Sequence, residues 1–226
     1  MKDLPLLAQP IKAVLFDLDG TFADTAPDMA HALNVIRDHQ GLTALPLAAV
    51  RPYVSHGARG MLDVGFGISP KHETFIALRD AFYDQYQRYL CVDSTLFDGI
   101  DVLVDMLEKH NIAWGIVTNK AARFAIPIIS ALGVGKRAGC IVCGDTTAHT
   151  KPHPAPLLHA AKLIGIAPGE SLYVGDDVRD IQAAHAAGMR GVVATNGYIG
   201  VDADPGCWGA EFSIAAPSEL WPLLCD

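Results

Sequence analysis

The 226-residue sequence lacks any apolar run close to the roughly 20 residues that a membrane-spanning helix needs. Its first ten residues contain a single lysine and an apolar segment that is too short for a secretory signal. Both absences predict a cytoplasmic protein with no membrane partner.

Positive charge is scarce as well. The chain carries 17 lysine and arginine residues against 25 aspartate and glutamate residues, which gives a formal net charge of -8. This balance argues against a broad nucleic-acid interface and predicts no nucleic-acid partner. A small anionic molecule would have to be bound locally, by a metal ion and a few lysines.

The sequence also gives no sign of disulfide bonds. It has five cysteines, and an odd number favours free thiols. Cys140 and Cys143 have the spacing of a zinc or redox motif. However, no second cysteine or histidine pair lies nearby in the sequence, and residues 139–143 have the pattern of a buried strand. We therefore expect both thiols to pack in the core.

Residues 14–21 join a buried strand to a group of acids. The short apolar run 13–16 predicts a strand that is buried on both faces. Asp17 and Asp19 follow with one residue between them, a spacing that directs both side chains the same way at a strand end. Two carboxylates a few ångströms apart repel each other by roughly 4 kcal/mol at an effective dielectric of about 20, so the pair predicts a bound cation. The alternative is an acidic turn after a strand.

Helical and strand patterns divide the chain into two regions. Between residues 25 and 94 hardly any strand signal is found, and helical spacing recurs over residues 27–40, 47–53, 58–64 and 71–90. After residue 98 helices and strands alternate, which implies a parallel sheet with helices on both faces. We therefore predict an α/β fold with a Rossmann-like core of residues 1–24 and 95–226, and an inserted all-helical cap over residues 25–94.

Two further polar clusters follow predicted strands, at residues 118–120 and 175–180. Ligand sites of open α/β sheets form at the carboxyl ends of strands, where these clusters lie. A threonine hydroxyl with backbone N–H groups at a helix N-terminus can bind phosphate, although a simple helix cap is the alternative. The carboxylates of the second cluster suit Mg²⁺, whereas Asp177 is equally explained as an acid at a helix N-terminus.

The sequence Asp17-Leu18-Asp19-Gly20-Thr21 after an apolar strand resembles the first motif of the haloacid dehalogenase superfamily of phosphohydrolases. The resemblance extends over nearly the whole chain. Its pattern is similar to the phosphoglycolate phosphatase-like enzymes, and among them to the N-acetylmuramic acid 6-phosphate phosphatases of bacterial cell-wall recycling. The segments 196–198 and 207–210 resemble that branch weakly, and packing at the edge of the core is the alternative. The resemblance also implies a central first strand, flanked by the second and fourth core strands.

The same resemblance implies roles for individual residues. Asp17 would be the nucleophile that forms an aspartyl-phosphate, and Asp19 would protonate the leaving oxygen and later activate water. Mg²⁺ would be bound by Asp17, by the backbone carbonyl of Asp19 and by Asp176, while Asp180 would support the site through water or hydrogen bonds. Lys151, otherwise typical of a solvated surface, matches the phosphate-binding lysine of the family.

Four other residues are candidates for contact with the substrate. Thr118 and Asn119 would help to bind phosphate, and Lys120 is a candidate for the substrate rim. In the predicted cap, the loop at residues 55–60 can place Arg59 against a substrate carboxylate, which both glycolate and muramic acid carry. A helix boundary with a surface arginine is the alternative.

These patterns together predict a Mg²⁺-dependent phosphatase that acts on a small phosphorylated sugar or sugar acid. N-acetylmuramic acid 6-phosphate is the first candidate substrate and 2-phosphoglycolate is the second. A phosphoryl-transfer mutase of the β-phosphoglucomutase type would share the acid pair and the helical cap. A non-catalytic sugar-phosphate sensor would not need a proton donor beside the nucleophile. The sequence leaves open whether the chain acts as a monomer or a homodimer.

Overall fold

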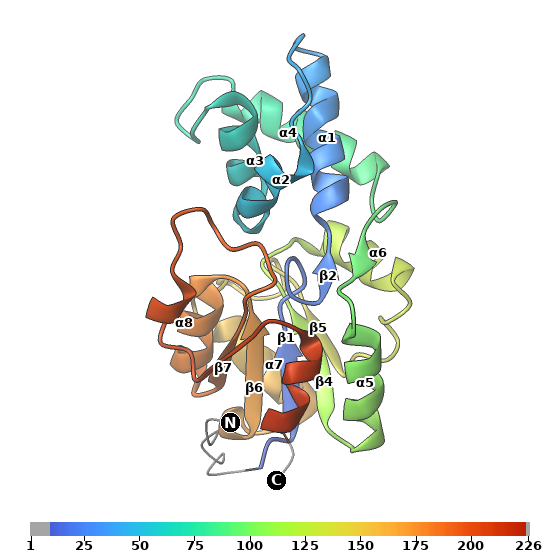
Figure 1. The fold of residues 1–226 in the computed structure, drawn as a ribbon, viewed down its shortest axis with the longest axis vertical. Helices are drawn as coiled ribbons and strands as arrows, with labels where there is room; N and C mark the ends of the chain where they lie inside the picture. The colour runs from blue at the N-terminus through green and yellow to red at the C-terminus, as the bar shows by residue number, and fades with distance from the viewer. Residues whose placement is uncertain (1–9, 225–226) are drawn as a thin grey trace.

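A six-stranded sheet forms the centre of the computed structural model, which describes residues 10–224 (Figure 1). All neighbouring strands are parallel, in the order β5-β4-β1-β6-β7-β8. The strands are β1 Ala13–Phe16, β4 Ala113–Val117, β5 Cys140–Val142, β6 Ser171–Gly175, β7 Arg190–Ala194 and β8 Phe212–Ile214. The predicted central position of the first strand, between the second and fourth core strands, is confirmed. Residues that follow β4, β1 and β6 consequently meet at one edge of the sheet.

Helices cover both faces of this sheet, as the alternation of helices and strands predicts. Side chains alternate along β1, so that Val14 and Phe16 pack with one pair of helices while Leu15 packs with the other. The first pair is α5 Ile100–Lys109 and α6 Ala122–Ala131, and the second pair is α7 Ala155–Ile164 and α8 Val178–Ala187. The α/β fold is therefore confirmed.

The helices of the N-terminal third stand beyond the carboxyl edge of the sheet (Figure 1). They are α1 Ala26–Asp38, α2 Leu47–Val50, α3 Gly57–Phe66 and α4 Phe75–Arg88, with a 3-10 helix Arg51–His56 after α2. They share a hydrophobic cluster to which α6 contributes Phe124 and Ile128. The helical layer therefore packs directly against the sheet domain, while the predicted domain boundaries stay a prediction.

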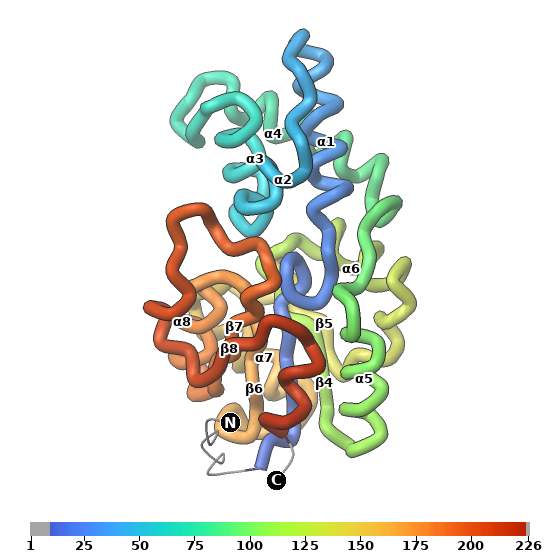
Figure 2. Tube along the Cα trace, in the orientation of Figure 1, coloured from blue at the N-terminus to red at the C-terminus, as the bar shows by residue number. Residues whose placement is uncertain are grey.

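The chain crosses twice between the sheet and this helical layer, and the two crossings lie side by side (Figure 2). Strand β2 Ala23–Asp24 leaves the sheet domain and pairs antiparallel with β3 Thr95–Leu96, which returns to it. Just above this ribbon, the buried Asp28 carboxylate accepts hydrogen bonds from the backbone N–H groups of residues 92, 93 and 94. The carboxylate thus fastens the first turn of α1 to the returning segment.

Some element boundaries differ from the predicted ones. The α-helix that begins at Leu47 ends at Val50, because Pro52 has no N–H to continue it, and a 3-10 helix follows. Helix α4 begins at Phe75 rather than at Lys71. Strand β8 and the short β2–β3 ribbon were not predicted, since runs of two or three residues carry little periodicity.

Cys140 and Cys143 behave as core residues, whereas Cys207 is exposed. Cys140 on β5 and Cys143 just after it are buried free thiols, and burial raises the pKa of each to about 11. Low reactivity at neutral pH follows, as expected for packing rather than redox chemistry. No helix among residues 10–224 is long and apolar enough to cross a membrane.

Candidate active site

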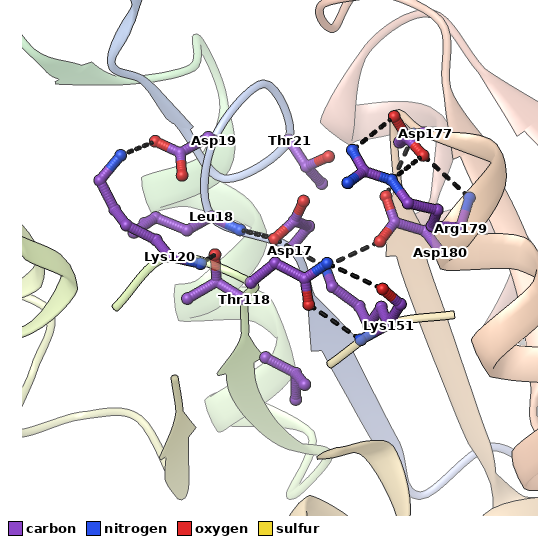
Figure 3. Close-up of polar contacts among 12 residues, drawn as sticks. Asp17, Leu18, Asp19, Thr21, Thr118, Lys120, Lys151, Asp177, Arg179 and Asp180 are labelled. Atoms are coloured by element: carbon purple, nitrogen blue, oxygen red, sulfur yellow. Dashed lines mark hydrogen bonds and ion pairs between the residues drawn. The ribbon is translucent and has the colours of Figure 1, made fainter. Parts of the chain in front are cut away.

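Asp17 lies directly after β1 and is held by the strands beside it. Its backbone N–H donates to the Val174 carbonyl of β6 at 2.9 Å. Its Oδ1 accepts a hydrogen bond from the Leu18 N–H at 2.8 Å and lies 2.9 Å from Lys151 Nζ (Figure 3). Desolvation by burial raises the pKa of Asp17 to about 6, although the charge of Lys151 opposes the shift.

The Lys151 ammonium is buried and its three hydrogens have three acceptors. Nζ lies 2.9 Å from Asp17 Oδ1 and 2.7 Å from Asp180 Oδ1, and it donates to the Tyr173 hydroxyl at 2.7 Å. The Tyr173 hydroxyl in turn donates to the Val117 carbonyl at 2.6 Å. Burial alone would lower the pKa of Lys151, but Asp17 and Asp180 raise it above its ordinary value. Lys151 is therefore a charged group fixed beside the candidate nucleophile.

Asn119 fixes the backbone of the lysine loop. Its Nδ2 donates to the Lys151 carbonyl at 3.0 Å, and its Oδ1 accepts the Lys151 N–H at 2.9 Å. Both polar ends of the amide are thereby engaged, so the side chain positions Lys151. The Thr118 hydroxyl accepts the Lys120 N–H at 3.1 Å and keeps its own proton to donate. Thr118 fits the predicted role of a phosphate contact better than Asn119 does.

Asp176 completes a cluster of three carboxylates. Oxygens of Asp17, Asp176 and Asp180 all lie within 4.8 Å of one another. Asp176 accepts the Tyr198 N–H at 2.7 Å and the Thr21 hydroxyl at 3.1 Å. Desolvation by burial, followed by the charges of the two other acids, raises the pKa of Asp176 well above its ordinary value. The predicted convergence is thus present for the acids that follow two of the three strands, β1 and β6.

Two glycines allow the chain to approach Asp176 so closely. A β-carbon on Gly20, whose φ is +83°, would lie 2.1 Å from Asp176 Oδ2. A β-carbon on Gly197 would lie 2.3 Å from the Asp176 β-carbon and 2.4 Å from the Gly20 carbonyl oxygen. Residues 196–198 therefore pack against the acidic cluster. The alternative from the sequence was that they only pack the edge of the core.

The donor set fits a small, hard divalent cation. Lys151 forms ion pairs with Asp17 and Asp180 but not with Asp176, so three clustered carboxylates face one ammonium in a desolvated place. Oxygen-only ligands of this kind suit Mg²⁺. Both oxygens of Asp176 accept hydrogen bonds, from the Thr21 hydroxyl and the Tyr198 N–H, so its place among the metal ligands stays a prediction. Asp180 binds Lys151 through one oxygen and the Asp177 N–H through the other at 3.1 Å, in agreement with its predicted supporting role.

Asp177 is explained by the helix that follows it. It is the N-cap of α8, its Oδ1 accepts the Arg179 N–H at 2.9 Å, and Asp180 completes the capping box. Asp177 also forms an ion pair with Arg179 at 2.7 Å. Although its partial burial acts the other way, these bonds to Arg179 lower the pKa of Asp177. Of the two alternatives left open by the sequence, the structure favours the helix cap.

Asp19 turns away from the acidic cluster, contrary to the expectation that both side chains point the same way. Strand β1 ends at Phe16, so the alternation of a strand no longer applies three residues later. The Asp19 carboxylate accepts a hydrogen bond from the Thr25 hydroxyl and lies 2.7 Å from Lys120 Nζ (Figure 3). The predicted metal ligand of Asp19 is its backbone carbonyl, so the direction of the side chain leaves that prediction unchanged.

A cavity of about 310 Å³ opens between the sheet edge and the helical layer. The predicted residues that line it are Asp17, Asp19, Thr118, Asn119, Lys120, Lys151 and Asp180. Asp176 lies outside the lining, only 1% exposed. On the side of the helical layer the wall is aromatic, with Phe82, Tyr83 and Tyr86 of α4 beside Phe124 of α6.

Arg59 does not reach this cavity. The expected loop around it is instead the start of α3, and successive residues of a helix point about 100° apart. Ala58 faces inward and lines the cavity, and Arg59 is consequently exposed.

Several residues at the site were not predicted from the sequence. Arg123 and Arg179 line the cavity, and Arg179 also donates to the Ser55 carbonyl of the helical layer at 2.7 Å. The Tyr198 hydroxyl donates to Asp24 at 2.6 Å and accepts the N–H groups of residues 25 and 26. No local pattern marks these residues, because their partners are distant in the sequence.

Known proteins share both this sequence and this fold. The family profile described as haloacid dehalogenase-like hydrolase matches residues 14–194. The N-acetylmuramic acid 6-phosphate phosphatase of Pseudomonas putida is 41% identical over 214 residues, which cover 95% of this chain and 96% of that protein. The phosphoglycolate phosphatase of Xanthomonas campestris pv. campestris is 45% identical over 214 residues, which cover 93% of this chain and 95% of that protein.

A solved structure supports the fold. The crystal structure of a predicted phosphoglycolate phosphatase from Haemophilus somnus superimposes with a TM-score of 0.84 at 24% identity, covering 96% of this chain and 100% of that one. Together with the extent of the family match, these relatives establish the class of the protein. The chain belongs to the haloacid dehalogenase-like hydrolase family, and it is a phosphoric monoester hydrolase.

Proposed function

We propose that this protein hydrolyses a phosphorylated sugar acid, with N-acetylmuramic acid 6-phosphate as the first candidate, in a reaction that requires Mg²⁺. The observation that carries the proposal is the cavity of about 310 Å³, which extends from Asp17 to an aromatic wall on α4. That volume lies in the range of pockets for ligands larger than a two-carbon acid. An aromatic wall suits the apolar face of a sugar ring.

Asp17 would attack the phosphorus atom. The Asp17 oxygen forms a bond to phosphorus while the bond to the ester oxygen breaks, and Asp19 gives its proton to that leaving oxygen. Asp19 then takes a proton from water, the water oxygen attacks phosphorus, and the aspartyl bond breaks to release phosphate. Asp19 lies in the cavity beside Asp17 yet outside the acidic cluster, as a proton donor for the leaving group should.

Cations on the chain would support this chemistry. Lys151, 2.9 Å from Asp17, would stabilise the transferring phosphoryl oxygens, and Asn119 holds its loop in place. Lys120, 2.7 Å from Asp19, would orient the carboxyl group for proton transfer. Asp17, Asp176 and the carbonyl of Asp19 would hold Mg²⁺, which, when bound, neutralises charge on the phosphoryl group.

A second candidate substrate is 2-phosphoglycolate. It is favoured by the 45% identity to the phosphoglycolate phosphatase of Xanthomonas campestris pv. campestris. Both candidates carry a carboxylate, so they differ chiefly in size. The volume of the cavity favours the larger one.

Steady-state kinetics with both substrates tests the proposal. We expect kcat/KM for N-acetylmuramic acid 6-phosphate to exceed that for 2-phosphoglycolate at least tenfold, and both activities to vanish with a chelator and return with Mg²⁺. The opposite preference would overturn the sugar-acid assignment. Isomerisation primed by a bisphosphate, with little free phosphate released, would point to a mutase instead.

A further inference from the structure

The charges around the cavity are matched, with one exception. Four lysine and arginine side chains line it among the described residues. Lys120 pairs with Asp19, Lys151 with Asp17 and Asp180, and Arg179 with Asp177. The fourth, Arg123, forms no ion pair with any acid in residues 10–224.

Arg123 is an exposed residue that, unlike Arg59, lines the cavity, and two aromatic rings contact its guanidinium. Its guanidinium carbon lies 4.9 Å from the centre of the Tyr83 ring and 4.5 Å from that of its neighbour Phe124. The two rings contact each other, with their centres 5.3 Å apart. Stacking against aromatic faces orients a guanidinium while leaving its N–H groups free for a planar anion. Carboxylates and phosphates both match this fork, and because the phosphate end of the ester belongs at Asp17, a carboxylate is the anion left for Arg123.

A second unsatisfied group belongs to the same wall. The Tyr86 hydroxyl is buried, and no group among residues 10–224 meets full hydrogen-bond geometry with it, although the Lys120 ammonium lies near enough to interact with it. The residue lines the cavity. The Tyr86 ring lies 5.3 Å from the Phe124 ring. The ammonium of Lys120 lies 5.0 Å from the centre of the Tyr86 ring but donates to Asp19. A buried hydroxyl without a partner is costly, and a ligand oxygen would satisfy it.

We propose that Arg123 and Tyr86 form the specificity site for the non-phosphate end of the substrate. Arg123 takes the substrate carboxylate, and Tyr86 donates to a ring hydroxyl or ether oxygen. This assignment replaces the predicted role of Arg59, and it rests on the proposed hydrolysis of a carboxylate-bearing ester. Because the two residues come from α6 and α4, the site forms only where the sheet domain meets the helical layer.

Two matched substrate pairs separate this inference from the proposed function. N-acetylmuramic acid 6-phosphate is compared with N-acetylglucosamine 6-phosphate, and 2-phosphoglycolate with ethyl phosphate. Within each pair only the first ester carries a carboxylate. We expect wild-type kcat/KM to favour the acid at least tenfold in one pair, Arg123→Met to remove that preference, and Arg123→Lys to keep part of it, since charge remains without the fork.

Control variants sharpen the result. Arg88→Met changes an exposed arginine on α4 outside the cavity lining and should leave the preference unchanged. Tyr86→Phe should lower kcat/KM for the sugar esters at least fivefold without lowering Tm, because the hydroxyl forms no hydrogen bond of full geometry among residues 10–224. If the Tyr86 hydroxyl had only a structural role, Tyr86→Phe would lower Tm and leave kcat/KM unchanged.

The outcomes are distinguishable. A wild-type enzyme without any preference for the acids refutes the proposed substrate class. A wild-type preference that survives in Arg123→Met refutes the specificity site alone, and a preference lost in Arg59→Met would return the role to α3. Unchanged kinetics in Tyr86→Phe would remove Tyr86 from the site.

Discussion

The carboxylate of Asp28 gives the sharpest test of how the helical layer is attached. Oδ1 accepts the Asp93 N–H at 2.8 Å, while Oδ2 accepts the N–H groups of Val92 and Ser94 and the Ser94 hydroxyl. Asp28→Asn keeps the shape but replaces one acceptor oxygen with an NH₂ group. If the remaining oxygen keeps the three bonds of Oδ2, the NH₂ group faces the Asp93 N–H and that bond is lost.

The expected loss can be estimated from these bonds. An N–H that loses its acceptor costs about 1 kcal/mol at a site as partly exposed as Asp93, and three bonds that lose charge assistance add about 0.5–1 kcal/mol each. The free energy of unfolding should therefore fall by about 2.5–4 kcal/mol. For a chain of this size that corresponds to a drop in Tm of roughly 5–15 °C.

Differential scanning calorimetry of Asp28→Asn against Asp93→Asn measures the effect. Asp93 is exposed and contributes only its backbone N–H to the cluster, so the same chemical change there should move Tm by less than about 2 °C. Hydrogen exchange at residues 92–94 should accelerate only in Asp28→Asn. Equal melting temperatures of the two variants would refute the idea that this carboxylate fastens the crossing.

Three further predictions concern the site itself. Asp17→Asn should abolish turnover and, in chelator at pH 7.5, raise the free energy of unfolding by about 1–3 kcal/mol. The folded pKa of Asp17 is about 6 against 3.8, so the metal-free wild type should lose stability as the pH rises from about 4 to about 6. Urea titrations of Asp17→Asn should lack this slope, and an unchanged slope would contradict the burial argument. Asp19→Asn should lose at least a hundredfold in kcat on an alkyl phosphate but much less on p-nitrophenyl phosphate, whose leaving group needs no proton; equal losses would exclude Asp19 as the general acid. Added Mg²⁺ should raise the Tm of chelator-treated wild type but not that of Asp176→Asn, and an equal rise in both would place the ion elsewhere.

The sheet and the acids could be predicted because their signals are local. An apolar run followed by Asp17, Asp19 and Gly20 is visible within eight residues, and parallel topology then brings the other strand ends to the same edge. The resemblance to a known family supplied Lys151, whose buried place no local pattern indicates.

The remainder depended on contacts between distant segments. Asp28 has the pattern of an ordinary acid in the first turn of a helix, yet its partners lie 64–66 residues away. The Tyr198 hydroxyl meets Asp24 across 174 residues. Arg59 and Arg123 are equally plausible from composition, and only the turn of each helix decides which one enters the cavity.

The acidic cluster shows why stability and activity should respond together to the metal ion. Burial raises the pKa of Asp17 and of Asp176, so the fold holds both groups where their ionised forms are disfavoured. Gly20 and Gly197 are needed because the chain packs closely around Asp176, and this packing does not stabilise the negative charge of its carboxylate. A cation between the carboxylates relieves that cost in the same place where it would assist phosphoryl transfer. Arg123 lies outside that cluster, on the aromatic wall, and its substitution should therefore change substrate preference while leaving the dependence of Tm on Mg²⁺ intact.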